Sequence, residues 1–322
     1  MKKIISLLLA VLLLAGTAAS LAEGGAERTV DMPIAGMRFT EPAEFTGTKG
    51  QIHTDEALQL YGSMYYAYWT YFAMTEEELD EVFHDADKAA DADYYDLFYL
   101  ISTGEGQTFD DFNSLINNYF DAQYATQIGQ AGDTTFYLYM EPADQKFADS
   151  LDPEYKEEYL RLAALGDKIT AGIECYEPYD PLVGTKVEFT TTDLDGNEIS
   201  SADLFAQNEI TMVNIWATWC GPCVNELAEL QQIHLRMREK DCGIVGLLDD
   251  DKLETARQLI ADNGVEYTVI LAPENFDDVF PITAYPSSFF VSRDGVILDS
   301  AVVGAYTELY EAELDKLLAP QE

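Results

Sequence analysis

Cys220 and Cys223 stand three positions apart, with Gly221 and Pro222 between them and Trp219 before them. Two thiols at this spacing can close into a disulfide. If a helix begins at Cys220, its free N–H groups and positive dipole end favour the thiolate, the reactive form of cysteine. Pro222 suits the first turn of such a helix, where a missing N–H leaves no hydrogen bond unmade. The spacing therefore predicts dithiol chemistry, in which Cys220 attacks a partner and Cys223 resolves the mixed disulfide.

A Cys-x-x-Cys pair also supplies half of many zinc sites, so metal binding is the alternative interpretation. A zinc site needs two further ligands at matching spacing. The remaining thiols and imidazoles are isolated in the sequence: Cys175, Cys242, His53, His84 and His234. We therefore expect redox chemistry at the pair, no metal, and no cofactor other than the redox-active disulfide itself.

The redox state of Cys175 and Cys242 has two alternative interpretations. In an oxidising compartment they form a structural disulfide, which would close a long loop and stabilise the fold by about 4 kcal/mol in the chain-entropy model. Otherwise both thiols stay free. The sequence does not choose between these alternatives.

The segments around the dithiol alternate between strand and helix patterns. An apolar run at 210–216 predicts a buried strand that leads into the pair, and 224–239 continue the helix. The elements expected next are a strand at 243–248, a helix at 252–263, a strand at 267–271, a helix at 275–280, a hairpin of 288–292 and 296–303, and a helix at 307–318. This order implies an α/β domain with a mixed central sheet covered by helices on both faces.

A turn signal precedes this pattern. Asp195-Gly196 lies between the β-prone runs 187–192 and 198–200, which is typical of a hairpin. The stretch Asp193 to Asn197 is also acidic, but its residues do not have the spacing of a calcium loop. We expect a turn here rather than a metal site.

The front part of the chain predicts a separate α+β unit. Strands are expected at 94–102 and 134–140, and helices directly after Thr75, at 108–121 and at 153–172. The aromatic residues of 62–74 favour a strand there, with a helix as the alternative because of its length and its alanines. Of the 20 tyrosines, 16 precede Cys220. Aromatic side chains in such numbers either line a ligand groove or fill a core, and we expect core packing here.

The first residues have the pattern of an export signal. Met1-Lys2-Lys3 is followed by an apolar run to Ala15 and by small residues to Ala22. We expect a signal peptide at 1–22, a flexible segment at 23–31, an α+β domain of unknown role at 32–175, a linker at 176–181 and the dithiol domain at 182–322. An uncleaved signal would act as an anchor, and this is the one membrane contact that we expect, because no later run approaches the ~20 apolar residues of a span.

The charge of the chain excludes one class of partner. Lys and Arg number 18 and Asp and Glu 59, so the formal net charge is 18 − 59 = −41. Such a chain is repelled by phosphate backbones and by anionic lipid surfaces. We expect no nucleic-acid partner.

Residues 182–318 resemble the thioredoxin superfamily and, within it, the TlpA/ResA-type extracytoplasmic disulfide reductases. The resemblance lies in Val213–Cys223, in Glu226, in Tyr285–Val291 and in the stretch after Leu248. It implies that Pro286 forms a cis peptide bond facing the dithiol and that Tyr285 and Pro286 form a wall of the substrate groove. Trp219, Gly221 and Pro222 complete the groove. No family is identified for residues 32–175.

Glu226 is a further candidate for the chemistry. It follows Cys223 by three residues, so a helix places both on one face. A carboxylate there can take and return the Cys223 proton or raise a thiol pKa by charge repulsion, whereas the alternative is an ordinary exposed helix residue. Thioredoxin has a buried Asp where this chain has Asn214, so the resemblance favours Glu226 as its substitute.

The expected function is that of an exported thiol-disulfide oxidoreductase acting as a reductase on protein disulfides. The resemblance implies a membrane-embedded thiol as electron donor. One alternative is a surface module, in which the front domain binds a ligand or protein and the dithiol domain is accessory. A thiol peroxidase is disfavoured, because peroxiredoxins carry a Pro-x-x-x-Thr/Ser-x-x-Cys loop and the residues before Cys220 lack that proline.

Overall fold

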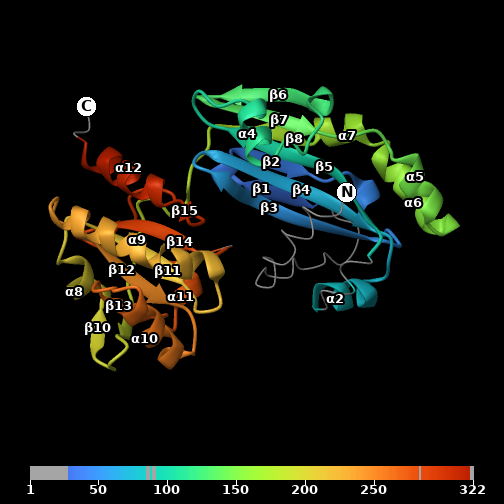
Figure 1. Cartoon of the computed structure of the whole chain (residues 1–322). Coiled ribbons are helices and arrows are strands. Elements are labelled where there is room, and N and C mark those ends of the chain that lie inside the picture. The colour runs from blue at the N-terminus through green and yellow to red at the C-terminus, as the bar shows by residue number, and fades with distance from the viewer. Residues whose placement is uncertain (1–27, 85–87, 89–91, 283, 320–322) are drawn as a thin grey trace. The chain divides into compact units, whose positions relative to one another are not determined.

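The computed structural model of the protein describes residues 28–84, 88, 92–282 and 284–319 (Figure 1). The chain divides into two compact units, and the boundary falls between Tyr179 and Asp180. We call the part up to Tyr179 unit 1 and the part from Asp180 unit 2. The predicted signal peptide at 1–22 and residues 23–27 of the predicted flexible segment lie outside the described residues.

Unit 1 is built on two antiparallel sheets. Its strands are β1 (Thr29–Met32), β2 (Met37–Thr40), β3 (Gln51–Tyr61), β4 (Met64–Phe72), β5 (Tyr94–Thr103), β6 (Ala125–Ala131), β7 (Thr134–Tyr139) and β8 (Ile173–Cys175). Its α-helices are α2 (Glu76–His84), α4 (Phe109–Leu115), α5 (Gln145–Ser150), α6 (Pro153–Ala163) and α7 (Gly166–Ala171). The short 3-10 helices are η1 (Pro33–Ala35), η2 (Ala43–Phe45) and η3 (Ala122–Tyr124). The strand orders are β1-β2-β8 and β3-β4-β5-β7-β6.

The five-stranded sheet of unit 1 carries an apolar cluster on each face, because side chains alternate along its strands. Trp69 of β4 and Phe98 of β5 pack on one face against Phe39 of β2. Tyr66 of β4 packs on the other face against Phe112 of α4. The aromatic surplus of the front part therefore lies mainly in these two cores.

The predicted strands at 62–74, 94–102 and 134–140 are confirmed as β4, β5 and β7. Two of the predicted helices are wrong in extent. The helix expected at 108–121 ends at Leu115, because Asn117 and Asn118 adopt positive φ and Asn113 bonds to the backbone of Phe120. The helix expected at 153–172 is two helices, α6 and α7.

Both edges of unit 1 differ from the predicted boundaries. The flexible segment predicted at 23–31 is wrong at its end, because Thr29–Met32 is strand β1, paired with β2. The linker predicted at 176–181 is wrong at its start. The backbone N–H of Tyr176 bonds to the carbonyl of Gly36, and that of Tyr179 to the carbonyl of Pro33. Residues up to Tyr179 are therefore part of unit 1.

Unit 2 is the predicted α/β domain. Its strands are β9 (Thr190–Thr192), β10 (Glu198–Ser200), β11 (Ile210–Trp216), β12 (Cys242–Leu248), β13 (Val269–Leu271), β14 (Ser287–Ser292) and β15 (Val302–Val303). Its helices are α8 (Ser201–Phe205), α9 (Gly221–Arg238), α10 (Leu253–Asp262), α11 (Phe276–Val279) and α12 (Thr307–Leu318). The Asp195-Gly196 turn joins β9 and β10, with Gly196 at φ +83.

The central sheet of unit 2 is mixed, with the order β13-β12-β11-β14-β15 (Figure 1). Strands β11, β12 and β13 are parallel, whereas β14 is antiparallel to β11. One face packs against α9 and α12, and the other against α8 and α11. The predicted fold, a thioredoxin-like domain and a separate unit with sheets and helices, is confirmed.

Candidate active site

The dithiol lies where β11 ends and α9 begins. The amide of Cys220 bonds to the carbonyl of Ala217 at 3.1 Å, so residues 217–220 form a turn between strand and helix. Cys220 is the N-cap of α9, and its Sγ accepts a hydrogen bond from the amide of Cys223 at 3.3 Å. The first turn of an 18-residue helix therefore faces this sulfur with its amides and its positive dipole end.

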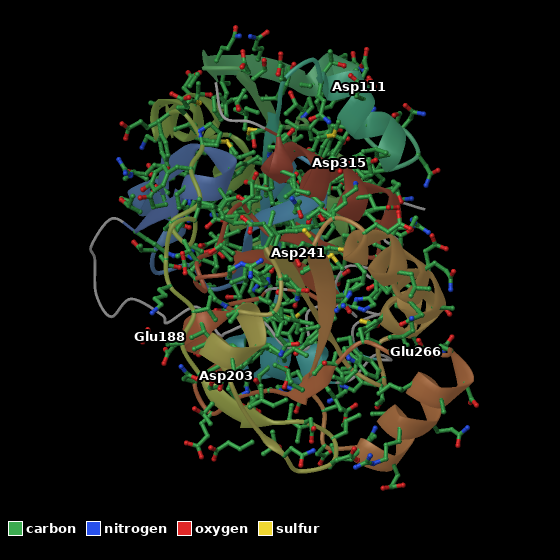
Figure 2. The ribbon with its side chains drawn as sticks, turned by 90° about the vertical axis from the view of Figure 1, so that its left-hand side faces the viewer. Asp111, Glu188, Asp203, Asp241, Glu266 and Asp315 are labelled. Atoms are coloured by element: carbon green, nitrogen blue, oxygen red, sulfur yellow. A yellow bond between two sulfur atoms is a disulfide. The ribbon has the colours of Figure 1, made fainter. Side chains whose placement is uncertain are left out.

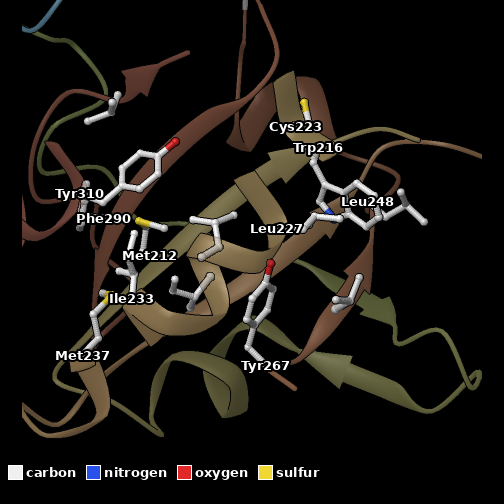
Figure 3. Close-up of a cluster of buried hydrophobic side chains, with 14 of the residues drawn as sticks. Met212, Trp216, Cys223, Leu227, Ile233, Met237, Leu248, Tyr267, Phe290 and Tyr310 are labelled. Carbon is white, nitrogen blue, oxygen red and sulfur yellow. The ribbon is translucent and has the colours of Figure 1, made fainter. Parts of the chain in front are cut away.

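The structure contains the pair in its disulfide form. The two sulfurs lie 2.05 Å apart and the two Cα atoms 5.3 Å apart. Cys223 belongs to the buried cluster that includes Trp216 and Leu227 (Figure 3). Its exposed fraction is 1% and that of Cys220 is 5%, so Cys220 is the more accessible of the two sulfur-bearing residues.

Two aromatic residues lie beside the dithiol. Trp219 is 59% exposed, and its ring meets that of Tyr285 edge-on at 5.1 Å between centroids. Tyr285 packs against the same cluster that holds both cysteines. The Tyr285–Pro286 peptide bond is cis, as the resemblance implied, and Pro286 is buried. Gly221 and Pro222, in the first turn of α9, are exposed.

Glu226 is buried, with 4% of its surface exposed, so it is not an ordinary surface residue. Its Oε1 accepts a hydrogen bond from Asn214 Nδ2 at 2.9 Å, and its Oε2 accepts one from the Tyr310 hydroxyl at 3.0 Å. Burial raises the pKa of Glu226 to about 7, although these two hydrogen bonds act in the opposite direction. The carboxyl group can therefore gain or lose a proton near neutral pH.

The sequence-based interpretation missed most of the residues that hold this site. Tyr310 comes from α12, and Ser288 of β14 accepts a second hydrogen bond from Asn214 at 3.1 Å. Asp249 and Asp250 lie in the stretch after Leu248 that carries part of the resemblance, but they were given no role there, although each bonds to a residue beside the dithiol. A second signal is that they directly follow a buried strand parallel to β11, where the carboxyl ends of the strands meet at one edge.

Of the two alternatives for Cys175 and Cys242, the structure has the second: both thiols are free and no disulfide joins them. Cys175 is half-buried in β8 of unit 1, whereas Cys242 is buried in β12 of unit 2. The Cys242 thiol donates a hydrogen bond to the carbonyl of Lys240 at 3.3 Å. Burial raises the pKa of both thiols, so each is less ready to ionise than a free cysteine.

Within the described ranges, no group of three or more His, Cys, Asp or Glu side chains is arranged to hold a metal ion. Among these same residues, no helix has both the length and the apolar character of a membrane span.

Three comparisons place unit 2 among known proteins. A family model described as the AhpC/TSA family matches residues 183–300. The thiol-disulfide oxidoreductase ResA of Bacillus thuringiensis (strain Al Hakam) is 25% identical over 130 residues, which are 40% of this chain and 74% of that protein. The thiol:disulfide interchange protein DsbE of Allochromatium vinosum is 29% identical over 135 residues, which are 41% of this chain and 72% of that protein.

A crystal structure of a thiol:disulfide interchange protein DsbE from Chlorobium tepidum superimposes with a TM-score of 0.38 and 25% identity, covering 42% of this chain and 98% of that one. The family match does not reach unit 1. Residues 183–300 therefore form an AhpC/TSA-type thioredoxin-like domain, with the thiol-disulfide oxidoreductases ResA and DsbE as homologues over about 40% of the chain.

Proposed function

We propose that this protein reduces disulfide bonds of extracytoplasmic protein partners through Cys220 and Cys223. The observation that carries the proposal is the position of Cys220 at the N-cap of α9, where its sulfur accepts the amide hydrogen of Cys223. In the reduced protein, the same helix end favours a thiolate at Cys220. A stabilised thiolate is the species that attacks a disulfide.

The reaction consists of two exchanges. The Cys220 thiolate attacks one sulfur of the partner disulfide, a new intermolecular S–S bond forms, and the other partner sulfur leaves as a thiolate that takes up a proton. Cys223 then loses its proton and attacks Cys220 Sγ, which breaks the intermolecular bond and releases the second partner thiolate. Two electrons pass to the partner, and the domain ends as the disulfide that the structure contains.

Glu226 is the group that we assign to the proton of Cys223. It lies one helical turn after Cys223 and shares its burial beneath the site. A general base works best when its pKa is near the working pH, and the pKa of Glu226 is about 7. Glu226 can therefore receive the Cys223 proton before the second exchange and return it later.

The groove residues present the partner to the dithiol. Exposed Trp219 and the Tyr285 ring form an aromatic surface next to Cys220, and Gly221 and Pro222 leave the approach open. Pro286 contributes the wall that the cis peptide bond shapes. Large, rigid aromatic side chains are suited to bind a protein segment at low entropic cost.

The place of action and the electron donor are inferred from the sequence. The pattern at 1–22 supports export, with an anchor if the signal is not cleaved. The disulfide left by each cycle must be reduced again by a dithiol donor, and the resemblance to TlpA/ResA-type reductases supports a membrane-embedded one. The reaction itself needs no further cofactor, because both electrons reside in the thiols.

Replacing Cys223 by Ser tests this assignment. The Cys223→Ser variant keeps the attacking sulfur but removes the resolving one, so we expect a covalent adduct through Cys220 when the reduced variant meets a disulfide protein such as insulin. Non-reducing electrophoresis and mass spectrometry of the linked peptides measure it. The Cys242→Ser/Cys223→Ser variant is the matched control and traps equally well, whereas Cys220→Ser/Cys223→Ser traps nothing. If the adduct is absent, or runs through Cys242, the assignment is wrong.

A further inference from the structure

Two consecutive aspartates bond to two segments that flank the dithiol: the turn before Cys220 and the residue before the cis Pro286. Asp249 and Asp250 directly follow β12, the strand parallel to β11 that leads into the dithiol. The Asp249 amide bonds to the carbonyl of Trp216, the last residue of β11, at 2.9 Å. The backbone of this short loop is thereby fixed to the strand end from which the Cys220 turn departs.

Asp250 holds the turn that carries Cys220. Its Oδ2 accepts hydrogen bonds from both the amide of Thr218, at 3.0 Å, and the Thr218 hydroxyl. Its Oδ1 accepts the amide of Lys252 at 2.9 Å, so the carboxylate itself cannot rotate freely. Thr218 stands two residues before Cys220, within the turn 217–220. A shift of Asp250 therefore moves the attacking sulfur.

Asp249 holds Tyr285, the residue that precedes the cis Pro286. Asp249 accepts a hydrogen bond from the hydroxyl of Tyr285. The Tyr285 ring in turn packs edge-on against Trp219. The orientation of this ring is therefore set at its tip by Asp249 and along its edge by Trp219.

The electrostatics agree with this geometry. Burial alone would raise the pKa of Asp250, but the hydrogen bonds from Thr218 and from the Lys252 amide outweigh it and lower this pKa. Burial, followed by the hydrogen bond to Asp249, raises the pKa of the Tyr285 hydroxyl, so this hydroxyl keeps its proton as a donor. At neutral pH Thr218 thus donates to an ionised Asp250, the stronger kind of hydrogen bond, and Tyr285 donates to Asp249 as a neutral hydroxyl.

We propose that Asp249 and Asp250 are positioning residues for the dithiol reaction, which together fix the Cys220 turn and the Tyr285 wall in the relative geometry that a partner disulfide requires. This inference rests on the proposed function and deepens it. Exchange between sulfurs demands close alignment of the attacking, central and leaving atoms, and small misplacements of a reacting group reduce rates strongly. Neither aspartate touches the reacting atoms in this role.

The positioning role of Asp250 is tested with two substitutions at that residue. Asp250→Ala removes both acceptor oxygens, whereas Asp250→Asn keeps one oxygen, which can accept both Thr218 hydrogens but leaves the Lys252 amide without its acceptor. We expect Asp250→Ala to lower kcat/KM for insulin reduction about tenfold, and Asp250→Asn to recover it to within about threefold of the wild type. Asp251→Ala, in the same loop but with an exposed side chain, is the matched control. Thermal melting verifies that each variant is folded.

The positioning role of Asp249 is tested with a double-mutant cycle. Asp249→Ala and Tyr285→Phe remove opposite ends of one hydrogen bond, and Tyr285→Phe keeps the ring against Trp219. If the bond positions the wall, each single change raises KM for insulin and the double variant is no worse than the more affected single variant. We expect a greater loss toward insulin than toward oxidised glutathione, because a small disulfide needs less of the wall.

Some outcomes would overturn the inference. The positioning role of Asp250 is contradicted if kcat/KM of Asp250→Ala stays within twofold of the wild type, or if Asp250→Ala and Asp250→Asn lose kcat/KM equally. The positioning role of Asp249 is contradicted if the losses in the double-mutant cycle are fully additive. The pH profile of Cys220 alkylation by iodoacetamide in the reduced protein needs no disulfide substrate. Alkylation therefore separates the positioning inference from the proposed function. If the wild type reduces no disulfide, the proposed function fails. If Asp250→Ala leaves the alkylation profile of Cys220 unchanged, the positioning inference alone fails.

Discussion

Glu226 owes its properties to a competition between burial and hydrogen bonding. Removing a carboxylate from water disfavours its charge, whereas donors aimed at its oxygens favour it. Asn214 and Tyr310 each supply one such donor, yet the pKa remains near 7 because desolvation is the larger effect. A single buried position thus provides a group that is charged in part of the molecules and neutral in the rest.

This residue makes the stability of unit 2 depend on pH. In the folded protein Glu226 keeps its proton up to about pH 7, whereas an unfolded Glu loses it near pH ~4.3. The folded state therefore binds more protons in this window, and the contribution of Glu226 to the free energy of unfolding falls as pH rises from about 4 to 7. Against Glu226→Gln, which does not titrate, we expect a relative loss on the order of 3 kcal/mol between pH 4 and pH 8, measured by urea unfolding.

The same variant provides a kinetic readout. Glu226→Gln should slow the release of the mixed disulfide by about 100-fold at pH 7, with a smaller defect toward pH 9, where Cys223 ionises without help. A stability difference that is constant across pH would show that the pKa of Glu226 is the same in the folded and unfolded protein, and a kinetic defect that does not vary with pH would refute its role as a base.

The site residues that the sequence predicted are those linked by short spacing. Cys220, Cys223 and Glu226 lie within two turns of one helix, so helical geometry alone relates them. Tyr310 reaches Glu226 across 84 residues of chain, and Asp250 reaches Thr218 across 32. No local pattern encodes such pairs, because they arise only after the strands have assembled into a sheet.

At the scale of elements, β11, β12 and α9 support the site, and the side chains between them are closely packed. A Cβ atom placed on Gly246 of β12 would lie 3.2 Å from the Tyr267 ring and 3.3 Å from Trp216 Nε1. Both neighbours are buried, so they can give way only by disturbing the core (Figure 3). Gly246 thus allows β12 to pack closely against Trp216, the last residue before the dithiol turn.

We expect Gly246→Ala to destabilise unit 2 by about 1–3 kcal/mol, because an added methyl overpacks a filled core. Gly221→Ala is the matched control, since a Cβ there meets no atom within 4 Å. Its effect should stay within about 0.5 kcal/mol. Chemical denaturation of both variants measures the difference, and equal stabilities would show that Tyr267 and Trp216 yield easily.

The elements that the sequence missed lack a clear period. Strand β3 bulges, with Ala57 at a positive φ and a shift of register between Asp55 and Leu58, so its side chains do not alternate regularly. The helix predicted at 108–121 has the right apolar spacing, but Asn113 replaces helical hydrogen bonds by holding the backbone of Phe120. Side-chain bonding to the backbone competes with a helix in ways that apolar periodicity does not reveal.

At the scale of the whole molecule, acidic residues are spread over both units. The labelled carboxylates of Figure 2 are all exposed and come from different parts of the chain, three from helices and three from loops: Asp111, Glu188, Asp203, Asp241, Glu266 and Asp315. With a net charge of −41, the chain repels other copies of itself and other anions, which favours solubility. The apolar clusters, by contrast, are confined to the interior of each unit.

Because each unit has its own core, we expect the two to unfold in separate transitions. Leu162→Ala in α6 empties part of the core of unit 1, and Leu230→Ala in α9 does the same in unit 2; both side chains are fully buried. Each substitution should lower the free energy of unfolding of its own unit by about 2–5 kcal/mol, and so shift only the transition of that unit. Differential scanning calorimetry of the full chain measures both, and a single transition shifted by either variant would contradict the division.

Strand β8 closes the small sheet of unit 1 against β2, so Cys175 lies opposite Met37 in the register. As the chain emerges from its N-terminus, during synthesis or export, β2 therefore has to wait for nearly the whole front unit before its partner appears. Contacts between segments so far apart form slowly. The small sheet of unit 1 should consequently be completed only after residues 173–175 have emerged, and a chain truncated before residue 173 would lack a completed β1-β2-β8 sheet.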